Sequence, residues 1–274
     1  MNALCVKNLT KRYPTFTLES VSFSVDEGRV CGLVGANGAG KSTTLKGITG
    51  LIQTEGEAEI FSLPANSREA KSLVGYAGGG FRFYPQKKVK TLGVVVSAFY
   101  PHWDNAVFFQ KLRDFGIDPE KKISALSEGM KVKLSLALAL SHGARLLILD
   151  EPTSGLDPLS REGLCDAIYT LVKKEGLSVL FSTHITSDLT HLADDVVFLS
   201  NGKVLLNEPL QTLLGKYSLA VFPSRAGAQG IGMKEGKEGV TALVPRGFTA
   251  EGVRVSEPTI DDIIVHFEYE RRGM

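Results

Sequence analysis

A glycine-rich stretch near the N-terminus constrains the fold of this chain more than any other feature. It lies between an apolar run at 30–34 and a helix-forming run at 44–48, and it reads Gly35, Ala36, Asn37, Gly38, Ala39, Gly40, Lys41, Ser42 and Thr43. The pattern G-x-x-x-x-G-K-[ST] between a strand and a helix predicts a loop whose backbone N–H groups surround phosphate oxygens. Glycine allows this close approach, and the N-terminus of the following helix faces the same anion.

Two side chains of this loop indicate which anion it binds. We expect Lys41 to reach the outer phosphates of a nucleoside triphosphate. We expect the Ser42 hydroxyl to complete the ligand shell of Mg²⁺, a hard ion that takes oxygen ligands together with substrate phosphates.

The composition excludes several classes of protein. At 274 residues the chain can form one large or two small domains. Its 31 basic and 30 acidic side chains nearly cancel, which argues against a nucleic-acid binder and against a polybasic membrane patch. There is no apolar run of about 18 residues and no recognisable signal peptide, so we expect a soluble polypeptide.

A second group of candidate residues follows two apolar runs. Asp150 and Glu151 come directly after the run 146–149, and His184 ends the run 179–183. Continuously apolar strands are buried on both faces, and ligands bind at the carboxyl ends of strands in open parallel sheets. We therefore expect Asp150 to bind Mg²⁺ or its waters, Glu151 to orient an attacking water, and His184 to lie at a neighbouring strand end.

The remaining segments predict the organisation of the chain. Residues 4–25 alternate as antiparallel strands do, and Tyr13 in this region is either a packing residue or an aromatic that stacks on a purine. From about 66 to 134, aromatic-rich segments interrupted by proline and glycine predict an inserted, mostly helical subdomain. Ser127 is a candidate N-cap for the helix that follows it. Beyond Gly215 we expect a small appended unit.

With these motifs, the chain resembles the nucleotide-binding subunits of ATP-binding cassette (ABC) transporters over about 4–217. The resemblance implies an α/β fold: a P-loop NTPase core with a mixed sheet, an antiparallel β subdomain, the helical insertion at about 66–134, and a C-terminal accessory region at 218–274. In that family the segments 126–130, 146–151 and 154–157 are the signature motif, the magnesium strand with its catalytic glutamate, and the dimer-facing loop.

The resemblance also implies roles for single residues. His184 is the switch histidine, Asp157 ends the dimer-facing loop, and Tyr13 is the adenine-stacking aromatic. Ser127 and Gly129 are the signature residues that contact the γ-phosphate in the family, and they are present here, although Glu128 and Met130 replace its third and fifth residues.

One family motif has no direct counterpart. The family places a glutamine after the strand 73–76, where this chain has Ala77, Gly78, Gly79 and Gly80. Gln86 follows several residues later. Either Gln86 or a backbone or water contact at 78–80 replaces that glutamine.

The resemblance implies an ATPase that binds ATP and Mg²⁺ and dimerises on ATP with a second copy of itself or a homologous ATPase subunit. It implies a peripheral protein at the cytoplasmic face of the cell membrane, with a separate membrane-spanning subunit docked against 81–103 and no nucleic-acid partner. The aromatic pattern at 75–76, 83–85 and 99–104 resembles the bacterial exporter (ABC-2-like) branch, which handles peptide, antibiotic, lipid-linked or polysaccharide cargo.

Three alternatives remain. An importer ATPase differs only in the membrane subunit, which sets the direction of transport. A soluble ABC ATPase that acts on ribosomes or nucleic acid usually carries two cassettes or a long coiled-coil insertion, and the sequence has neither. An unrelated GTPase or small-molecule kinase is disfavoured, because the sequence has no Asn-Lys-x-Asp guanine-binding motif and the signature-like helix would be unexplained.

Overall fold

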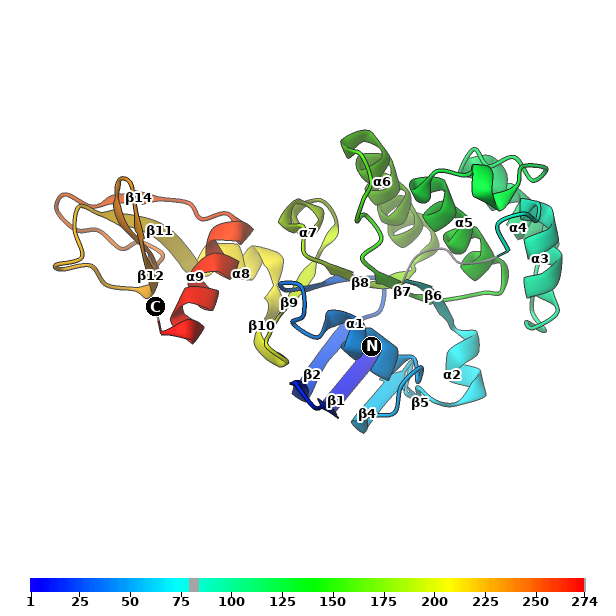
Figure 1. The fold of residues 1–274 in the computed structure, drawn as a ribbon, viewed down its shortest axis with the longest axis horizontal. Coiled ribbons are helices and arrows are strands. Elements are labelled where there is room, and N and C mark those ends of the chain that lie inside the picture. The colour runs from blue at the N-terminus through cyan, green and yellow to red at the C-terminus, as the bar shows by residue number, and fades with distance from the viewer. Residues whose placement is uncertain (79–83, 274) are drawn as a thin grey trace.

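Six strands form the central sheet (Figure 1). In spatial order they are β10 (Lys203–Pro209), β9 (Asp195–Ser200), β3 (Val30–Val34), β8 (Ser178–Thr183), β7 (Leu146–Asp150) and β6 (Val74–Gly78). The strands from β9 to β6 are parallel, and β10 is antiparallel to β9. The computed structural model describes residues 1–78 and 84–273. The predicted α/β class with a mixed sheet is confirmed, and the carboxyl ends of the parallel strands share one edge.

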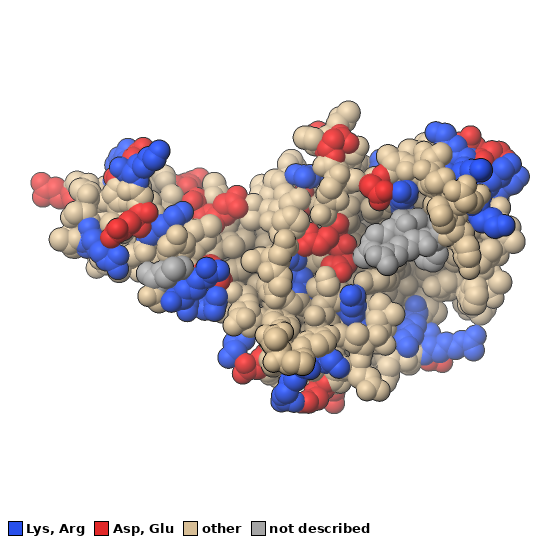
Figure 2. Space-filling model, in the orientation of Figure 1, with Lys and Arg blue, Asp and Glu red and all other residues tan. Residues whose placement is uncertain are grey.

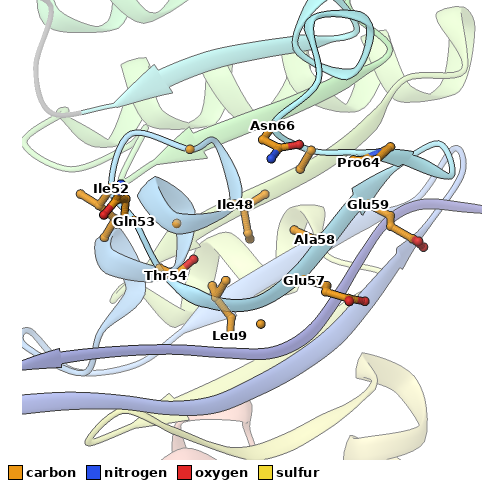
Figure 3. A pocket seen from close by; sticks show the side chains of 14 residues that line it. Leu9, Ile48, Ile52, Gln53, Thr54, Glu57, Ala58, Glu59, Pro64 and Asn66 are labelled. Carbon is orange, nitrogen blue, oxygen red and sulfur yellow. The ribbon is translucent and has the colours of Figure 1, made fainter.

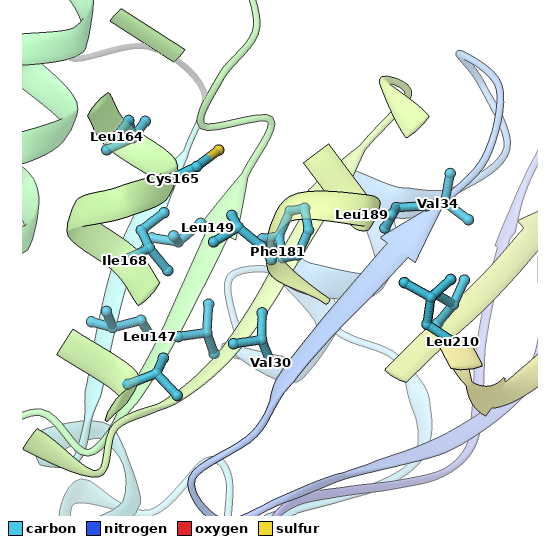
Figure 4. Close-up of a cluster of buried hydrophobic side chains, with 14 of the residues drawn as sticks. Val30, Val34, Leu147, Leu149, Leu164, Cys165, Ile168, Phe181, Leu189 and Leu210 are labelled. Carbon is cyan, nitrogen blue, oxygen red and sulfur yellow. The ribbon is translucent and has the colours of Figure 1, made fainter. Parts of the chain in front are cut away.

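Both faces of strand β7 are buried, which explains the unbroken apolar run from Leu146 to Leu149. Leu147 and Leu149 pack in a cluster with helices α6 (Pro158–Glu175) and α7 (Thr186–Leu192) (Figure 4). Leu146 and Ile148 pack in a second cluster that includes α1 (Lys41–Ile48). Successive side chains of a strand point to opposite faces, so a strand covered on both faces needs an unbroken apolar run. The helices that cover the sheet are α1 (Lys41–Ile48), α5 (Glu128–Ser141), α6 (Pro158–Glu175) and α7 (Thr186–Leu192).

A separate antiparallel sheet packs beside α1 (Figure 1). Its strands, in spatial order, are β2 (Phe16–Asp26), β1 (Asn2–Tyr13), β4 (Glu55–Ile60) and β5 (Leu63–Pro64). Strands β1 and β2 form a hairpin in which Tyr13 pairs with Phe16, so Pro14 and Thr15 form its tip. The predicted antiparallel β subdomain is confirmed, and its hairpin brings Tyr13 to the end of a strand.

The insertion between β6 and β7 has its own hydrophobic core. Its elements are α3 (Val89–Ser97), α4 (Asn105–Asp114), the 3₁₀ helix η1 (Ile123–Ala125) and α5, and a short helix α2 (Arg68–Ser72) precedes β6. Leu92, Phe108 and Leu134 belong to this core. The interval predicted for the insertion, about 66–134, also contains β6, which the structure places in the central sheet because Val74–Gly78 pairs with β7. The division of the chain into domains stays a prediction.

The last part of the chain forms a four-stranded antiparallel sheet with a helix (Figure 1). A helix α8 (Leu210–Lys216) leads into β11 (Tyr217–Phe222), β12 (Ile231–Gly236), β13 (Gly239–Pro245), β14 (Arg254–Ser256) and α9 (Ile260–Arg272). Two hydrogen bonds join α9 to the central part: Thr186 donates to Asp261 at 2.7 Å, and Ser200 donates to Glu268. Leu243, Ile260 and Ile263 belong to the same hydrophobic cluster as α6 and α7.

The surface carries both charges. On the face shown in Figure 2, lysine and arginine side chains are interspersed with aspartate and glutamate side chains. Among the helices in the two described ranges, none has the length and apolar character that a membrane span requires.

Candidate active site

The phosphate loop joins β3 to α1, as its sequence predicted. Gly38 and Gly40 have φ angles of +82° and +112°, in the left-handed region that favours glycine. A Cβ atom at Gly40 would lie 2.9 Å from side-chain atoms of Phe16 and Leu18, and one at Gly35 would collide with the carbonyl oxygen of Leu199. Both conformation and space therefore require glycine in this loop.

Lys41 begins α1 and turns back into the loop. Its side chain is only 6% exposed, and its Nζ atom donates hydrogen bonds to the carbonyl oxygens of Gly35 at 2.7 Å and Ala36 at 3.3 Å. The same ammonium lies 3.1 Å from Glu151 Oε1. A buried ammonium with these partners is held where phosphate oxygens would enter the loop.

Asp150 lies at the carboxyl end of β7 among hydroxyl groups. The Ser42 Oγ atom donates to Asp150 Oδ1 at 3.0 Å, and the Ser182 Oγ atom donates to the same oxygen at 2.6 Å. Hydroxyl and carboxylate oxygens are the hard donors that Mg²⁺ prefers, and Mg²⁺ in nucleotide sites uses few protein ligands beside the phosphates. The donor set of Ser42 and Asp150 fits that ion.

Glu151 is held between a lysine and a histidine. Its Oε2 atom lies 2.6 Å from the Nδ1 atom of His184, which donates the hydrogen bond when the proton is on Nδ1. Its φ angle is +52°, an uncommon conformation for a residue with a side chain. The backbone N–H of Glu151 donates to Ser182 Oγ at 2.9 Å. Such a strained backbone persists where the surroundings fix it.

Lys41, Ser42, Glu151 and His184 line one pocket of about 860 Å³. Of the other predicted residues of the loop and strand end, Gly35, Ala36, Ala39 and Asp150 do not line it, although Asp150 contacts Ser42. The predicted residues that line it are Tyr13, Asn37, Gly38, Gly40, Lys41, Ser42, Thr43, Glu151 and His184, and they are joined by Pro14, Thr15, Phe16 and Ser154. The Tyr13 side chain is exposed at the hairpin tip, 6.4 Å from the Phe16 ring between centroids. The volume lies within the range of small-molecule sites.

Three predicted residues lie outside the phosphate loop and outside the strand ends that carry Asp150, Glu151 and His184. Ser127 is the N-cap of α5, as predicted, and a Cβ atom at Gly129 would lie 3.7 Å from the side chains of Leu156 and Ser160. Asp157 caps α6, and its pKa is lowered by hydrogen bonds from the side chain and backbone of Ser160. Ser127, Gly129 and Asp157 are not among the residues that line the pocket of the phosphate loop. All three lie where the start of α5 meets the start of α6.

The two candidates to replace the missing family glutamine, Gln86 and the segment 78–80, lie in different surroundings. Gln86 is exposed, its Oε1 atom lies 3.5 Å from Lys122 Nζ, and it is not among the residues that line the pocket. Gly78 pairs with Asp150 across the sheet. Gly79 and Gly80 lie outside the described residues, as does the segment 81–83 of the predicted docking region.

Sequence reasoning missed Ser182. Its hydroxyl contacts both Asp150 and the backbone of Glu151. The available signal was its position two residues before His184, at the end of an apolar strand that pairs with β7. The pairing of Asp150 with Ser182 across β7 and β8 is what joins them.

A further pocket, of about 680 Å³, lies where α1 ends beside β1 and β4 (Figure 3). Leu9, Ile48 and Thr54 line it together with Glu57 and Asn66. Its lining contains no residue of the loop 35–43. The pocket at the N-terminus of α1 is therefore the candidate site for a triphosphate.

Comparison with known proteins supports the same conclusion. Residues 18–154 match the family model described as ABC transporter. The lantibiotic transport ATP-binding protein SrtF of Streptococcus pyogenes is 36% identical over 214 residues, which cover 75% of this chain and 90% of that protein. The bacitracin transport ATP-binding protein BcrA of Bacillus licheniformis is 34% identical over 213 residues, covering 75% and 69%.

A solved structure of the ATP-binding subunit of an ABC transporter superposes with a TM-score of 0.68 at 29% identity, and the match covers 77% of this chain and 91% of that one. The chain belongs to the ABC transporter family. It is an ATP-binding cassette with ATPase activity.

Proposed function

We propose that this chain binds ATP with Mg²⁺, dimerises on ATP, and hydrolyses it to drive export of a peptide, antibiotic or lipid-like cargo through a separate membrane subunit. The observation that carries the proposal is the convergence of Lys41, Glu151 and His184 on the pocket of the phosphate loop. The two relatives named above are described as lantibiotic and bacitracin transport proteins, which supports the choice of cargo class.

The contacts of Lys41 and Glu151 suggest how the site is activated. The Lys41 ammonium lies 3.1 Å from Glu151 Oε1. A triphosphate in the loop offers Lys41 a larger negative charge and so releases Oε1 to accept a hydrogen bond from the attacking water. Oε2 remains with His184, which fixes the direction of the carboxylate. Phosphoryl transfer to water depends mainly on such positioning and on charge stabilisation.

Ser42 and Asp150 would hold Mg²⁺, and Tyr13 would stack on the adenine. When bound, the ion neutralises charge that develops on the phosphate oxygens. Tyr13 is exposed on the hairpin and lines the same pocket, where its ring can contact a base.

The positions of Ser127, Gly129 and Asp157 support a shared site. They do not line the pocket of their own chain, so contact with a γ-phosphate requires them to come from a second protomer, which is a copy of this chain or a homologous ATPase subunit. A head-to-tail pair would complete two such sites. The Glu128 carboxylate in the signature segment lies 2.6 Å from Lys131 Nζ, which compensates its charge near that phosphate.

We place the membrane subunit on the helical insertion, with the protein at the cytoplasmic face of the cell membrane. The predicted docking region, 81–103, contains exposed apolar side chains: Val94 is 70% exposed, Phe99 75% and Tyr84 59%. Large exposed apolar groups of this kind are typical of protein contact sites. No nucleic-acid partner is proposed, since both charges are interspersed on the surface shown in Figure 2.

Co-expression with the membrane subunit tests this proposal. The complex should co-purify with the membrane fraction, and its ATPase rate should rise when cargo is added. Replacing Val94 and Phe99 with serine should abolish co-purification, whereas Tyr169→Ser, at another exposed aromatic on α6, should not. Binding to ribosomes or nucleic acid instead of a membrane protein would overturn the assignment.

A further inference from the structure

A buried carboxylate on α7 joins the two loops that carry the proposed catalytic residues. Asp188 is 1% exposed, and its Oδ2 atom accepts hydrogen bonds from Thr153 Oγ1 at 2.5 Å and Thr183 Oγ1 at 3.1 Å. Thr153 lies two residues after Glu151, and Thr183 immediately precedes His184. A single oxygen atom thus links the loop of the water-orienting glutamate to the loop of the histidine.

The hydroxyl groups in this link are shielded from solvent. Thr153 is 1% exposed and Thr183 is fully buried. The Thr183 Oγ1 atom also accepts a hydrogen bond from the backbone of Ile185 at 2.9 Å, which fixes the turn around His184. Buried polar groups lose more when a partner is removed than exposed ones do, because water cannot replace it.

The second oxygen of Asp188 faces the start of α6. Asp188 Oδ1 and Arg161 Nε lie 4.0 Å apart, and within the described residues neither atom makes a hydrogen bond. Arg161 is in the first turn of α6, which Asp157 caps. The Asp188 carboxylate therefore faces three elements: the loop after Glu151, the end of β8 just before His184, and the helix α6 that follows the predicted dimer loop.

We propose that Asp188 is a positioning residue for ATP hydrolysis, which fixes Glu151 and His184 relative to each other through Thr153 and Thr183. Glu151 has a φ angle of +52°, and a residue keeps that conformation only when its neighbours hold it; Ser182 holds its backbone N–H, and Thr153 anchors the segment that follows it. Release of Thr153 lets the segment after Glu151 relax and turns the carboxylate away from His184. The inference rests on the proposed roles of Glu151 and His184.

Thr153 offers the sharpest test, since valine and serine each alter one part of its side chain. Thr153→Val keeps the shape and removes the hydroxyl, whereas Thr153→Ser keeps the hydroxyl and removes a methyl group. In the purified full chain with Mg²⁺ and ATP, Thr153→Val should lower kcat by between about 10- and 100-fold, the loss expected when a catalytic group is displaced by about 1 Å. KM and the calorimetric Kd for ATP should stay within about threefold, and Thr153→Ser should stay close to wild type.

Combination with Glu151→Gln separates this inference from the proposed function. If Thr153 acts through Glu151, the double variant should be no slower than Glu151→Gln alone, because residues that act as a unit are not additive. A wild-type kcat in Thr153→Val, with Glu151→Gln inactive, would overturn the inference and leave the proposed function intact. Equal losses in Thr153→Val and Thr153→Ser would also overturn it. Wild-type turnover by Glu151→Gln would instead refute the proposed site.

Discussion

At the scale of single residues, the site is a series of contacts between charged and polar side chains. Lys41 contacts two loop carbonyls and Glu151, and Glu151 contacts His184. The sequence predicted each of these residues, because their types follow strands in a recognisable order. It did not predict the +52° φ angle of Glu151 or the part played by Ser182, since both depend on how β7 and β8 pair.

Replacement of Lys41 should weaken nucleotide binding. Lys41→Ala removes the only charge that lies buried within the phosphate loop, and ATP affinity should fall by at least about tenfold, the effect of losing a close, charge-assisted contact of roughly 1.4 kcal/mol or more. Calorimetric titration with ATP measures this directly. Lys46→Ala is the matched control, since it removes an exposed lysine from the same helix. Unchanged affinity in Lys41→Ala would refute the loop assignment.

At the scale of elements, α9 is tied to the central sheet through one carboxylate. Glu268 accepts hydrogen bonds from Ser200 on β9 and from Arg271 and Arg272 on its own helix. The sequence predicted only a small appended unit beyond Gly215, and the structure shows that this unit ends in a helix, Ile260–Arg272. The contact with Ser200 joins positions 68 residues apart, a distance over which local patterns carry no signal.

Loss of this carboxylate should change how stability depends on pH. Burial raises the pKa of Glu268, but the hydrogen bonds from Arg271, Ser200 and Arg272 lower it more, from 4.5 to about 2. Because the folded pKa lies below the unfolded one, the stabilisation is complete above about pH 4.5 and is lost as the pH falls toward 2. Glu268→Gln should therefore lower Tm at pH 7, by the equivalent of about 1–3 kcal/mol, and should flatten the decline of Tm in acid.

Thermal melts between pH 7 and pH 2 measure this dependence. Glu257→Gln serves as the control, because Glu257 pairs with Arg246 in the same C-terminal unit but is 86% exposed on its side chain. Exposed pairs contribute little to stability, so this variant should follow wild type. If the Tm of Glu268→Gln falls with pH as steeply as the Tm of wild type, the stabilising role of the Glu268 carboxylate is contradicted.

At the scale of the whole molecule, Ser127, Gly129 and Asp157 do not line the pocket of the phosphate loop in their own chain. The order of motifs along the sequence was sufficient to predict the family, the mixed sheet and the phosphate loop. A strand at 73–76 was expected from the resemblance, but its place in the central sheet was not predicted, because its pairing with β7 decides that place. Likewise, nothing in the local pattern shows that Ser127 lies away from the pocket, since that depends on how α5 packs against α6.

Mixing two inactive variants tests the shared site. Lys41→Ala disables the phosphate loop, and Ser127→Arg blocks the exposed start of α5. In a mixed dimer one site pairs the intact loop of one chain with the intact Ser127 of the other. Random exchange between closed dimers makes about half of them mixed, each with one of two sites intact, so about a quarter of the wild-type rate should return. Each variant alone, at the same total concentration, is the control. No recovery would indicate that each chain works alone.

The most direct test of the account is the ATPase rate of Glu151→Gln, measured together with ATP binding. We expect kcat to fall by at least about 100-fold, because a water-positioning base is lost, while ATP still binds. Glu175→Gln, which removes a carboxylate paired with Lys111 at the far end of α6, should leave both quantities unchanged. Wild-type turnover by Glu151→Gln would contradict the account, because the pocket of the phosphate loop would then hydrolyse ATP without the residue placed at its centre.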